Sequence, residues 1–142
     1  MRLKATNAIL SVMECDPQQK AETKKRLAQI QEMYGFIPVA NKVLSERPDL
    51  FLPNTDVSRS VLEGKGVLDR KTRYLIATAA AAAMGGEYCI HNQMKHAIEA
   101  GANRDEILEA LQIASFMAMT RTQSYAFREF AHQFNVDTGE RQ

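Results

Sequence analysis

The sequence predicts an all-α fold, and two observations support this prediction. Long stretches of apolar residues recur in steps of three and four, as on one face of a helix, and no useful stretch alternates with the period of a strand. Aspartate-proline, Asn-x-x-Glu and glycine signals separate these stretches, as at helix ends. The length suits one domain over residues 1–142, with an N-terminal arm at 1–16 and a fraying tail at 136–142.

Composition and charge exclude several classes of function. The net charge is +1, and no basic stripe with interleaved aromatic residues suggests nucleic-acid binding. No apolar run is long enough to span a membrane, and no signal peptide precedes the first helix, so we expect a cytoplasmic protein. The two cysteines, Cys15 and Cys89, are far apart and give no disulfide framework.

The first part of the chain predicts three helical segments. Asp16-Pro17 is a cap followed by a proline at the first helical position, and the helix is expected to run to Tyr34 and end at Gly35. A second helix is expected from Phe36-Ile37-Pro38, and Arg47-Pro48 marks a third. Pro53 lies inside this third segment and should kink or interrupt it.

The middle of the chain predicts a helical hairpin. Asp69 caps a helix whose alanine-rich run to Met84 carries little side-chain bulk, so we expect a buried central helix. Gly85-Gly86 should end it, because glycine tolerates the left-handed conformation. If Gly86 is the left-handed residue, Gly86→Ala should cost about 1 kcal/mol. Glu87 then opens a second helix that closes at Gly101.

The last part of the chain predicts two more helices. Asn103 and Glu106 have the spacing of a capping box and start a helix that runs past Met117. A separate last helix is expected to carry an aromatic stripe that belongs to the core or to a subunit interface. The members of this stripe are Tyr125, Phe127, Phe130 and Phe134.

Candidate chemistry lies at the start of the helix that Glu87 opens. Cys89 falls in its first turn, where free N–H groups favour a thiolate, although Glu87 opposes this effect. Gln93 lies one turn below Cys89, and His96 follows on the same face about 10 Å along the axis. Alternatively, Cys89 is a small core residue. His91 and His96 are five residues apart and diverge, so we expect no metal site and no cofactor.

These residues resemble the AhpD-like superfamily, which includes alkylhydroperoxidases and carboxymuconolactone decarboxylases. The resemblance covers residues 34–130 and rests on Glu-Tyr-Cys at 87–89, a helix ending in Ala-Gly-Ala, and the following Glu-Ile-Leu-Glu-Ala. Tyr-Gly-Phe-Ile-Pro at 34–38, Arg-Pro-Asp-Leu at 47–50 and Gly-Val-Leu at 66–68 resemble the peroxidase-related branch. The resemblance implies an antiparallel helix-hairpin core that assembles into homo-oligomers, trimers or hexamers.

The site pattern of this superfamily is incomplete here. The pattern is a glutamate, a Cys-x-x-Cys pair and a histidine four residues after the second cysteine. Aligned on Tyr88-Cys89 and Gly101, the peroxide-reacting cysteine is Cys89, and the first cysteine falls on Gly86. The histidine falls on Gln93 and the glutamate on Tyr74. Glutamine forms hydrogen bonds but transfers no proton near neutral pH.

The sequence therefore supports more than one functional hypothesis. In the first, Cys89 reduces a small hydroperoxide, with Gln93, Tyr74 and His96 around it, and an external thiol resolves the oxidised sulfur. In the second, the chain is an oligomeric binding relative without catalysis. A decarboxylase-type lyase remains a third hypothesis by family analogy. Gly86→Cys should be tolerated if Gly86 stands in the place of the first cysteine.

Overall fold

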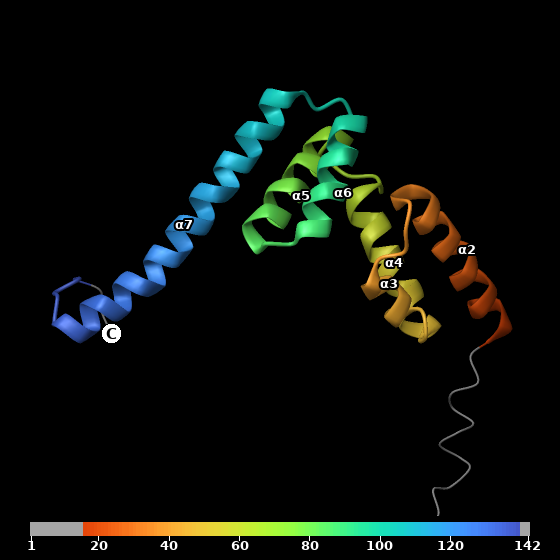
Figure 1. Ribbon diagram of the computed structural model, residues 1–142, viewed down its shortest axis with the longest axis horizontal. Coiled ribbons are helices and arrows are strands. Elements are labelled where there is room, and N and C mark those ends of the chain that lie inside the picture. Colours follow the sequence, from red (N-terminus) through yellow and green to blue (C-terminus); the bar gives the residue numbers. More distant parts are fainter. Residues whose placement is uncertain (1–15, 140–142) are drawn as a thin grey trace, which may run out of the picture. The chain divides into compact units, whose positions relative to one another are not determined.

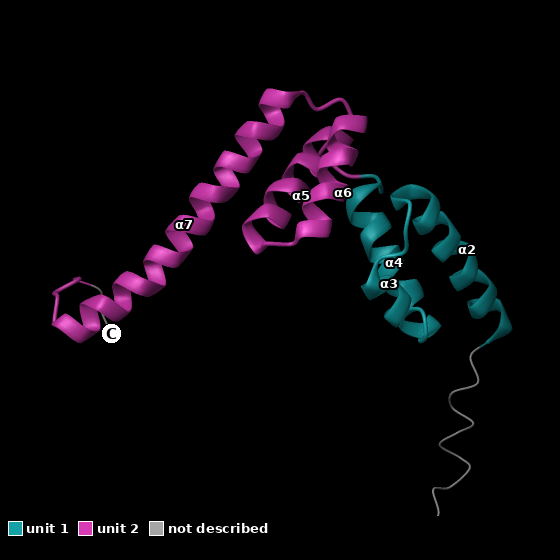
Figure 2. Ribbon diagram, viewed as in Figure 1, with its two compact units in different colours: residues 1–65 teal, residues 66–142 magenta. Residues whose placement is uncertain are grey.

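The computed structural model describes residues 16–139, and every regular element within them is a helix (Figure 1). This confirms the predicted all-α fold class. The chain divides into two compact units, residues 1–65 and 66–142 (Figure 2), and the single-domain expectation stays a prediction. The N-terminal arm at 1–15, with Cys15, lies outside the described residues. The helices are α2 (Pro17–Tyr34), α3 (Val39–Leu44), α4 (Pro48–Leu62), α5 (Arg70–Met84), α6 (Glu87–Glu99) and α7 (Arg104–Phe134).

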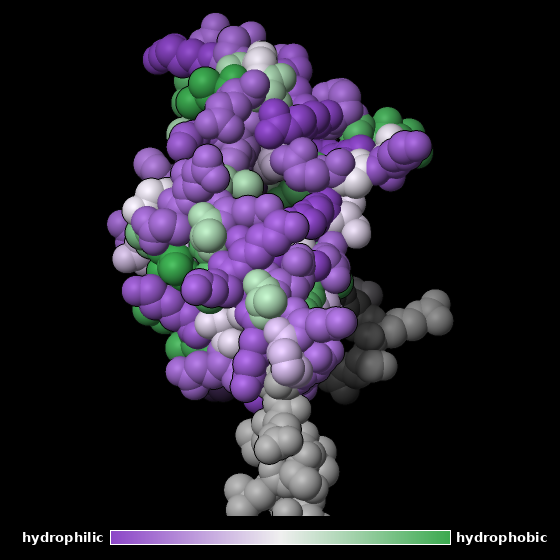
Figure 3. All heavy atoms as spheres, turned by 90° about the vertical axis from the view of Figure 1, so that its right-hand side faces the viewer, coloured by the Kyte–Doolittle hydropathy of each residue, from purple (hydrophilic) through white to green (hydrophobic). Residues whose placement is uncertain are grey.

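Unit 1 consists of α2, α3 and α4, and its helix ends follow the predicted signals. The carboxylate of Asp16 accepts a hydrogen bond from the Gln18 N–H at 3.0 Å, which caps the start of α2. Gly35 ends α2 in the left-handed conformation with φ of 77°. Phe51 of α4 is completely buried, and α4 contacts both α2 and α3. The surface over α2 in Figure 3 is mostly hydrophilic, as expected of its lysines and glutamates.

Arg26 ties α2 to α4. Its guanidinium donates hydrogen bonds to Glu22 at 2.9 Å, to the Leu52 carbonyl at 3.0 Å and to Thr55 at 2.6 Å. It also forms an ion pair with Asp56 at 2.6 Å, although its side chain is only 13% exposed. The hydrogen bond from Arg26 lowers the pKa of Glu22. A nearly buried arginine with four acceptors orients the two helices as well as holding them together.

Pro53 does not interrupt α4, which excludes the interruption, and a kink at Pro53, the other expected outcome, stays a prediction. The helix continues from Pro48 to Leu62 with Pro53 inside it. Pro53 removes one hydrogen bond, the one its missing N–H would donate to the Asp49 carbonyl. This position is still near the start of the helix, and packing against α2 compensates for one absent bond.

Unit 2 is built around α5, which contacts both α6 and α7. Asp69 caps α5 by accepting from the Thr72 N–H at 2.9 Å, as predicted. The predicted hairpin of α5 and α6 is therefore the centre of this unit. The burial of α5 is limited to one face, since Tyr74, Thr78 and Ala81 are buried whereas Ile76 and Met84 are exposed.

The capping box at the start of α7 also fastens this helix to α5. Asn103 accepts from the Glu106 N–H at 2.9 Å, and the Glu106 carboxylate accepts from the Asn103 N–H at 2.9 Å. The same carboxylate pairs with Lys71 of α5 at 2.6 Å. The Lys71 ammonium, and then the Asn103 N–H, hold the pKa of Glu106 below its usual value. One side chain thus serves both the cap and the contact between helices.

The two predicted C-terminal helices are one continuous helix, α7, so their separation is wrong. No glycine or proline lies between Met117 and Tyr125, and the hydroxyl groups in this stretch bond to the helix itself. Thr122 donates to the Ala118 carbonyl at 3.1 Å, and Ser124 donates to the Thr120 carbonyl at 2.8 Å. The polar stretch is therefore compatible with an uninterrupted helix. No helix among residues 16–139 has the length and apolarity needed to cross a membrane.

Candidate functional site at the start of helix α6

The turn between α5 and α6 uses its two glycines differently. Gly85 is left-handed, with φ of 74°, and ends α5. Gly86 has φ of −84° and is the residue that precedes α6, so it carries no left-handed strain. Its N–H donates to the Ala81 carbonyl at 3.0 Å. The destabilisation expected for replacing a left-handed glycine by alanine therefore applies to position 85 and not to position 86.

We expect Gly85→Ala to destabilise the protein by about 1 kcal/mol, because alanine rarely adopts the left-handed conformation that ends α5. No atom lies within 4 Å of a Cβ built on Gly85, so the cost is conformational and not steric. Gly85→Asn is the matched control, since asparagine tolerates this conformation. Chemical denaturation measures both variants. Equal stabilities for Gly85→Ala and Gly85→Asn would contradict a left-handed Gly85.

Cys89 is the third residue of α6, in the first-turn position that the sequence predicted, and its side chain is exposed, so it is not the small core residue of the alternative interpretation. Gly86 has no side chain with which to cap the helix, so the start of α6 is open beside the thiol. A Cβ built on Gly86 would lie 3.4 Å from the Cys89 Cβ and 3.7 Å from its Sγ. A side chain at position 86 would therefore point at the sulfur of Cys89.

Tyr74 and His96 form a buried polar contact between α5 and α6. Their ring centroids are 5.1 Å apart, and both residues are buried. The Nδ1 atom of His96 lies 3.1 Å from a Glu99 carboxylate oxygen, and the Arg70 guanidinium lies over the Tyr74 ring at 5.2 Å. Two of the four predicted site residues are thus brought together, within the interface of the hairpin.

Cys89 and Gln93 are one turn apart on α6, but no hydrogen bond within residues 16–139 links Cys89 to Gln93, Tyr74 or His96. The amide oxygen of Gln93 is buried and has no hydrogen-bond partner among the described residues. Any reaction at Cys89 therefore depends on the exposed thiol itself and on molecules that reach it from the solvent. The Tyr74–His96 contact positions the helix that carries the thiol.

Two buried polar residues of the hairpin, Thr78 and Asn92, were not predicted from the sequence. Thr78 is completely buried and donates to the Tyr74 carbonyl at 2.7 Å, and Asn92 is buried on α6. The spacing of these residues along their helices could have identified them. Tyr74 and Thr78 lie four residues apart on α5, and Asn92 and His96 lie four apart on α6, which places one polar pair on a single face of each helix.

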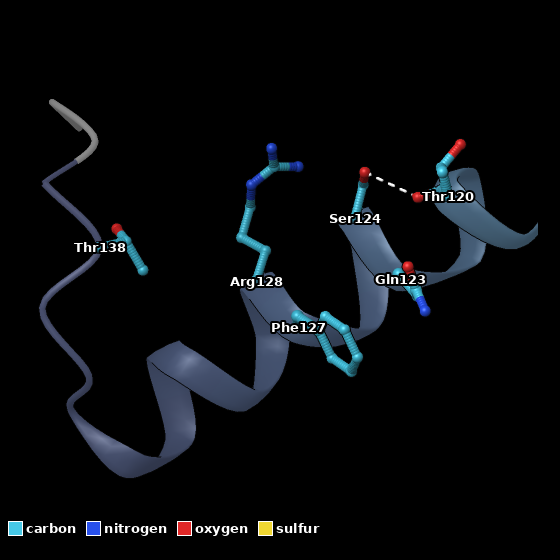
Figure 4. Close-up of a pocket in the computed structure, with 6 residues that line it drawn as sticks. All are labelled: Thr120, Gln123, Ser124, Phe127, Arg128 and Thr138. Atoms are coloured by element: carbon cyan, nitrogen blue, oxygen red, sulfur yellow. Dashed lines mark hydrogen bonds between the residues drawn. The ribbon is translucent and has the colours of Figure 1, made fainter. Parts of the chain in front are cut away.

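Other features of unit 2 lie away from Cys89. A groove of about 390 Å³ runs between α7 and the tail that follows it (Figure 4). Its lining residues are Thr120, Gln123, Ser124, Phe127, Arg128 and Thr138. His91 is exposed on α6. Among residues 16–139, no three histidine, cysteine, aspartate or glutamate side chains are grouped as metal ligands would be.

Comparisons with known proteins found a family match that begins at α4 and ends within α7. A model of the carboxymuconolactone decarboxylase family matches residues 48–132, which is more than half of the chain. The chain is 31% identical over 77 residues to a protein of Paracoccus denitrificans named "Uncharacterized protein 4 in cox locus". That match covers 54% of this chain and 69% of the relative. No solved structure matches.

Proposed function

The chain belongs to the carboxymuconolactone decarboxylase family, and we propose that it is a thiol-dependent oxidoreductase that reduces small hydroperoxides through Cys89. The observation that carries this proposal is the exposed thiol in the first turn of α6, with position 86 directed at its sulfur. This arrangement supports the alignment in which Cys89 is the peroxide-reacting member of an incomplete Cys-x-x-Cys pair.

The proposed reaction has three balanced steps. The Cys89 thiolate attacks the outer oxygen of ROOH, the O–O bond breaks, and sulfenic acid and ROH form once the alkoxide takes a proton. An external thiol then condenses with the sulfenic acid, releasing water and leaving a mixed disulfide. A second external thiol displaces Cys89 as thiolate. In total, one hydroperoxide and two thiols give one alcohol, one disulfide and one water.

The proposed steps take account of the two groups of the family pattern that are missing here, the first cysteine and the histidine. With glycine at position 86 there is no sulfur at that position to resolve the sulfenic acid, so we assign this step to an external thiol that reaches the exposed Cys89. The glutamine at position 93 forms hydrogen bonds but cannot transfer the proton, so water supplies it to the alkoxide. Tyr74 and His96 hold α5 against α6 and thereby position the thiol. We place the reaction in the cytoplasm, where small thiols stay reduced.

The test is peroxide consumption with an added dithiol. We expect slow turnover in the wild type, loss of all consumption above background in Cys89→Ser, and unchanged consumption in the matched control Cys15→Ser. Alkylation of the thiol followed against pH shows in the same samples whether Cys89 is reactive at neutral pH. Wild-type consumption no faster than that of Cys89→Ser would remove the enzyme hypothesis and favour the non-catalytic binding relative.

A further inference from the structure

The chain reverses direction after α7 and forms a second wall of the groove in Figure 4. Asn135 ends the helix in the left-handed conformation with φ of 52°, and the Val136 N–H donates to the Ala131 carbonyl at 2.9 Å. This turn brings Thr138 to the same groove as Thr120, although the two residues are far apart in the sequence. The groove therefore lies between two segments and is more than the surface of one helix.

The charged residue of the groove lining is an arginine. Arg128 is exposed, and its planar guanidinium carries N–H donors in an arrangement that matches a carboxylate or phosphate group. The nearest acidic residues in the sequence have other partners. Glu129 accepts a hydrogen bond from Gln133 at 2.7 Å, and Asp137 accepts one from the Gly139 N–H at 3.0 Å. Since no carboxylate among residues 16–139 lines the groove, its lining is positively charged.

Two hydroxyl groups of the groove already donate their protons to α7. Thr120 donates to the Met117 carbonyl at 3.0 Å, and Ser124 donates to the Thr120 carbonyl at 2.8 Å. Their oxygen atoms can therefore accept a hydrogen bond from a ligand, whereas the Gln123 amide can donate or accept one. Figure 4 shows Ser124 and Arg128 projecting from the same side of α7. A ligand with a hydroxyl group and an anionic group would match this pair.

An aromatic ring completes the lining. The Phe127 side chain is 63% exposed, so much of its ring is open to a ligand. Aromatic rings contact one another favourably in offset stacks or edge to face. The groove has a volume of about 390 Å³, within the range of about 300–1,000 Å³ that is typical of small-molecule sites. This space is sufficient for a compound with one ring.

We propose that this groove binds a small aromatic anion, with its carboxylate or phosphate group on Arg128, its ring against Phe127 and a hydroxyl group donating to Ser124. A carboxylate and a phosphate present similar oxygen acceptors to the guanidinium, so the probes of the experiment distinguish them. The site is separate from the proposed peroxide reaction, because its lining comes from α7 and the tail that follows it and not from α5 or α6.

Calorimetric titration of the full chain tests the site with 4-hydroxybenzoate, phenyl phosphate and inorganic phosphate. We expect saturable binding of at least one aromatic anion at millimolar concentration, and the tighter of the two identifies the anionic group. Inorganic phosphate should bind about tenfold more weakly because it makes no contact with the ring. Benzyl alcohol, the uncharged control, should not bind. Absence of binding by both aromatic anions at tens of millimolar would overturn the site.

Two substitutions at exposed positions test the assigned contacts. Arg128→Gln should weaken binding of the aromatic anion about tenfold or more, as expected for the loss of a charge-assisted hydrogen bond. Its matched control is Arg104→Gln, which removes the same charge from the start of α7, where the Arg104 side chain is 87% exposed. Phe127→Ala should weaken binding of the aromatic anion and leave inorganic phosphate unchanged. Phe116→Ala, at a 58% exposed position of the same helix, should change neither.

The outcomes that contradict the proposal are separate from those of the peroxidase test. Wild-type affinity in folded Arg128→Gln, or an equal loss in Arg104→Gln, would overturn the contact with the anionic group. Equal losses in Phe127→Ala and Phe116→Ala would overturn the contact with the ring. Cys89→Ser should bind the aromatic anion as the wild type does, whether or not Cys89 reduces peroxide. Loss of binding in Cys89→Ser would place the anion at the thiol and overturn the groove site.

Discussion

Gly86→Cys is expected to create a disulfide with Cys89 under mild oxidation. The Cβ built on Gly86 lies 3.4 Å from the Cys89 Cβ, close to the separation of about 3.5–4.5 Å found in disulfides. The φ angle of −84° suits any residue, so the substitution carries no left-handed strain. An introduced thiol would also resolve the Cys89 sulfenic acid within the chain. We therefore expect peroxide consumption at limiting external thiol to rise about tenfold or more.

The measurement is the number of free thiols before and after oxidation, in a Cys15→Ser background. Gly86→Cys should lose both remaining thiols and recover them with a dithiol. Gly85→Cys is the matched control, because a Cβ on Gly85 has no atom within 4 Å and does not approach Cys89. If both thiols of folded Gly86→Cys stayed titratable after oxidation, the alignment that places the missing cysteine at position 86 would be wrong.

The parts of the fold that sequence analysis predicted well depend on local chemistry. Asp16, Asp69 and Asn103 cap their helices through hydrogen bonds to residues two or three positions away. Gly35 and Gly85 end helices through their own backbone angles. Such signals are complete within a few residues, so no knowledge of the tertiary structure is needed to find them.

The wrong predictions concern places where a weak local signal competes with the surrounding helix. A separate last helix was expected to carry Tyr125, but the side chains of Thr122 and Ser124 bond to carbonyls one turn back and α7 is continuous. Pro53 suggested an interruption, but the contact of α4 with α2 outweighs the loss of one hydrogen bond. The continuity of α4 and of α7 depends on the stability of each helix as a whole, and single residues within them do not decide it.

The candidate site was predictable in sequence position but not in its contacts. The first-turn position of Cys89 follows from Gly85, Gly86 and Glu87 alone, and the structure confirms it. The ring contact of Tyr74 with His96 joins two helices, so spacing along one helix could not show it. His96 shares a helix face with Cys89, yet its partners are Tyr74 and Glu99.

Gln93→His is expected to raise the rate of peroxide consumption by about 100-fold, because a positioned imidazole acts as a general base and acid where glutamine does not. Position 93 lies one turn from Cys89 on α6, within reach of its thiol. The substitution also removes a buried amide oxygen that has no hydrogen-bond partner among the described residues. The rate should gain a pH dependence near about 6.5, the ordinary value for imidazole.

Stopped-flow measurement of peroxide reduction at several pH values checks this expectation. Lys95→His is the matched control, since it adds an imidazole to the same helix at an exposed position that does not share the face of Cys89. An equal acceleration in Lys95→His would show a general effect of histidine and not a placed base. No acceleration in a folded Gln93→His with an alkylatable Cys89 would mean that activation of this thiol does not pass through position 93. Glu87 and the start of α6 would then be the groups that determine the reactivity of Cys89, because a helix N-terminus carries partial positive charge and Glu87 is the acidic residue of its first turn.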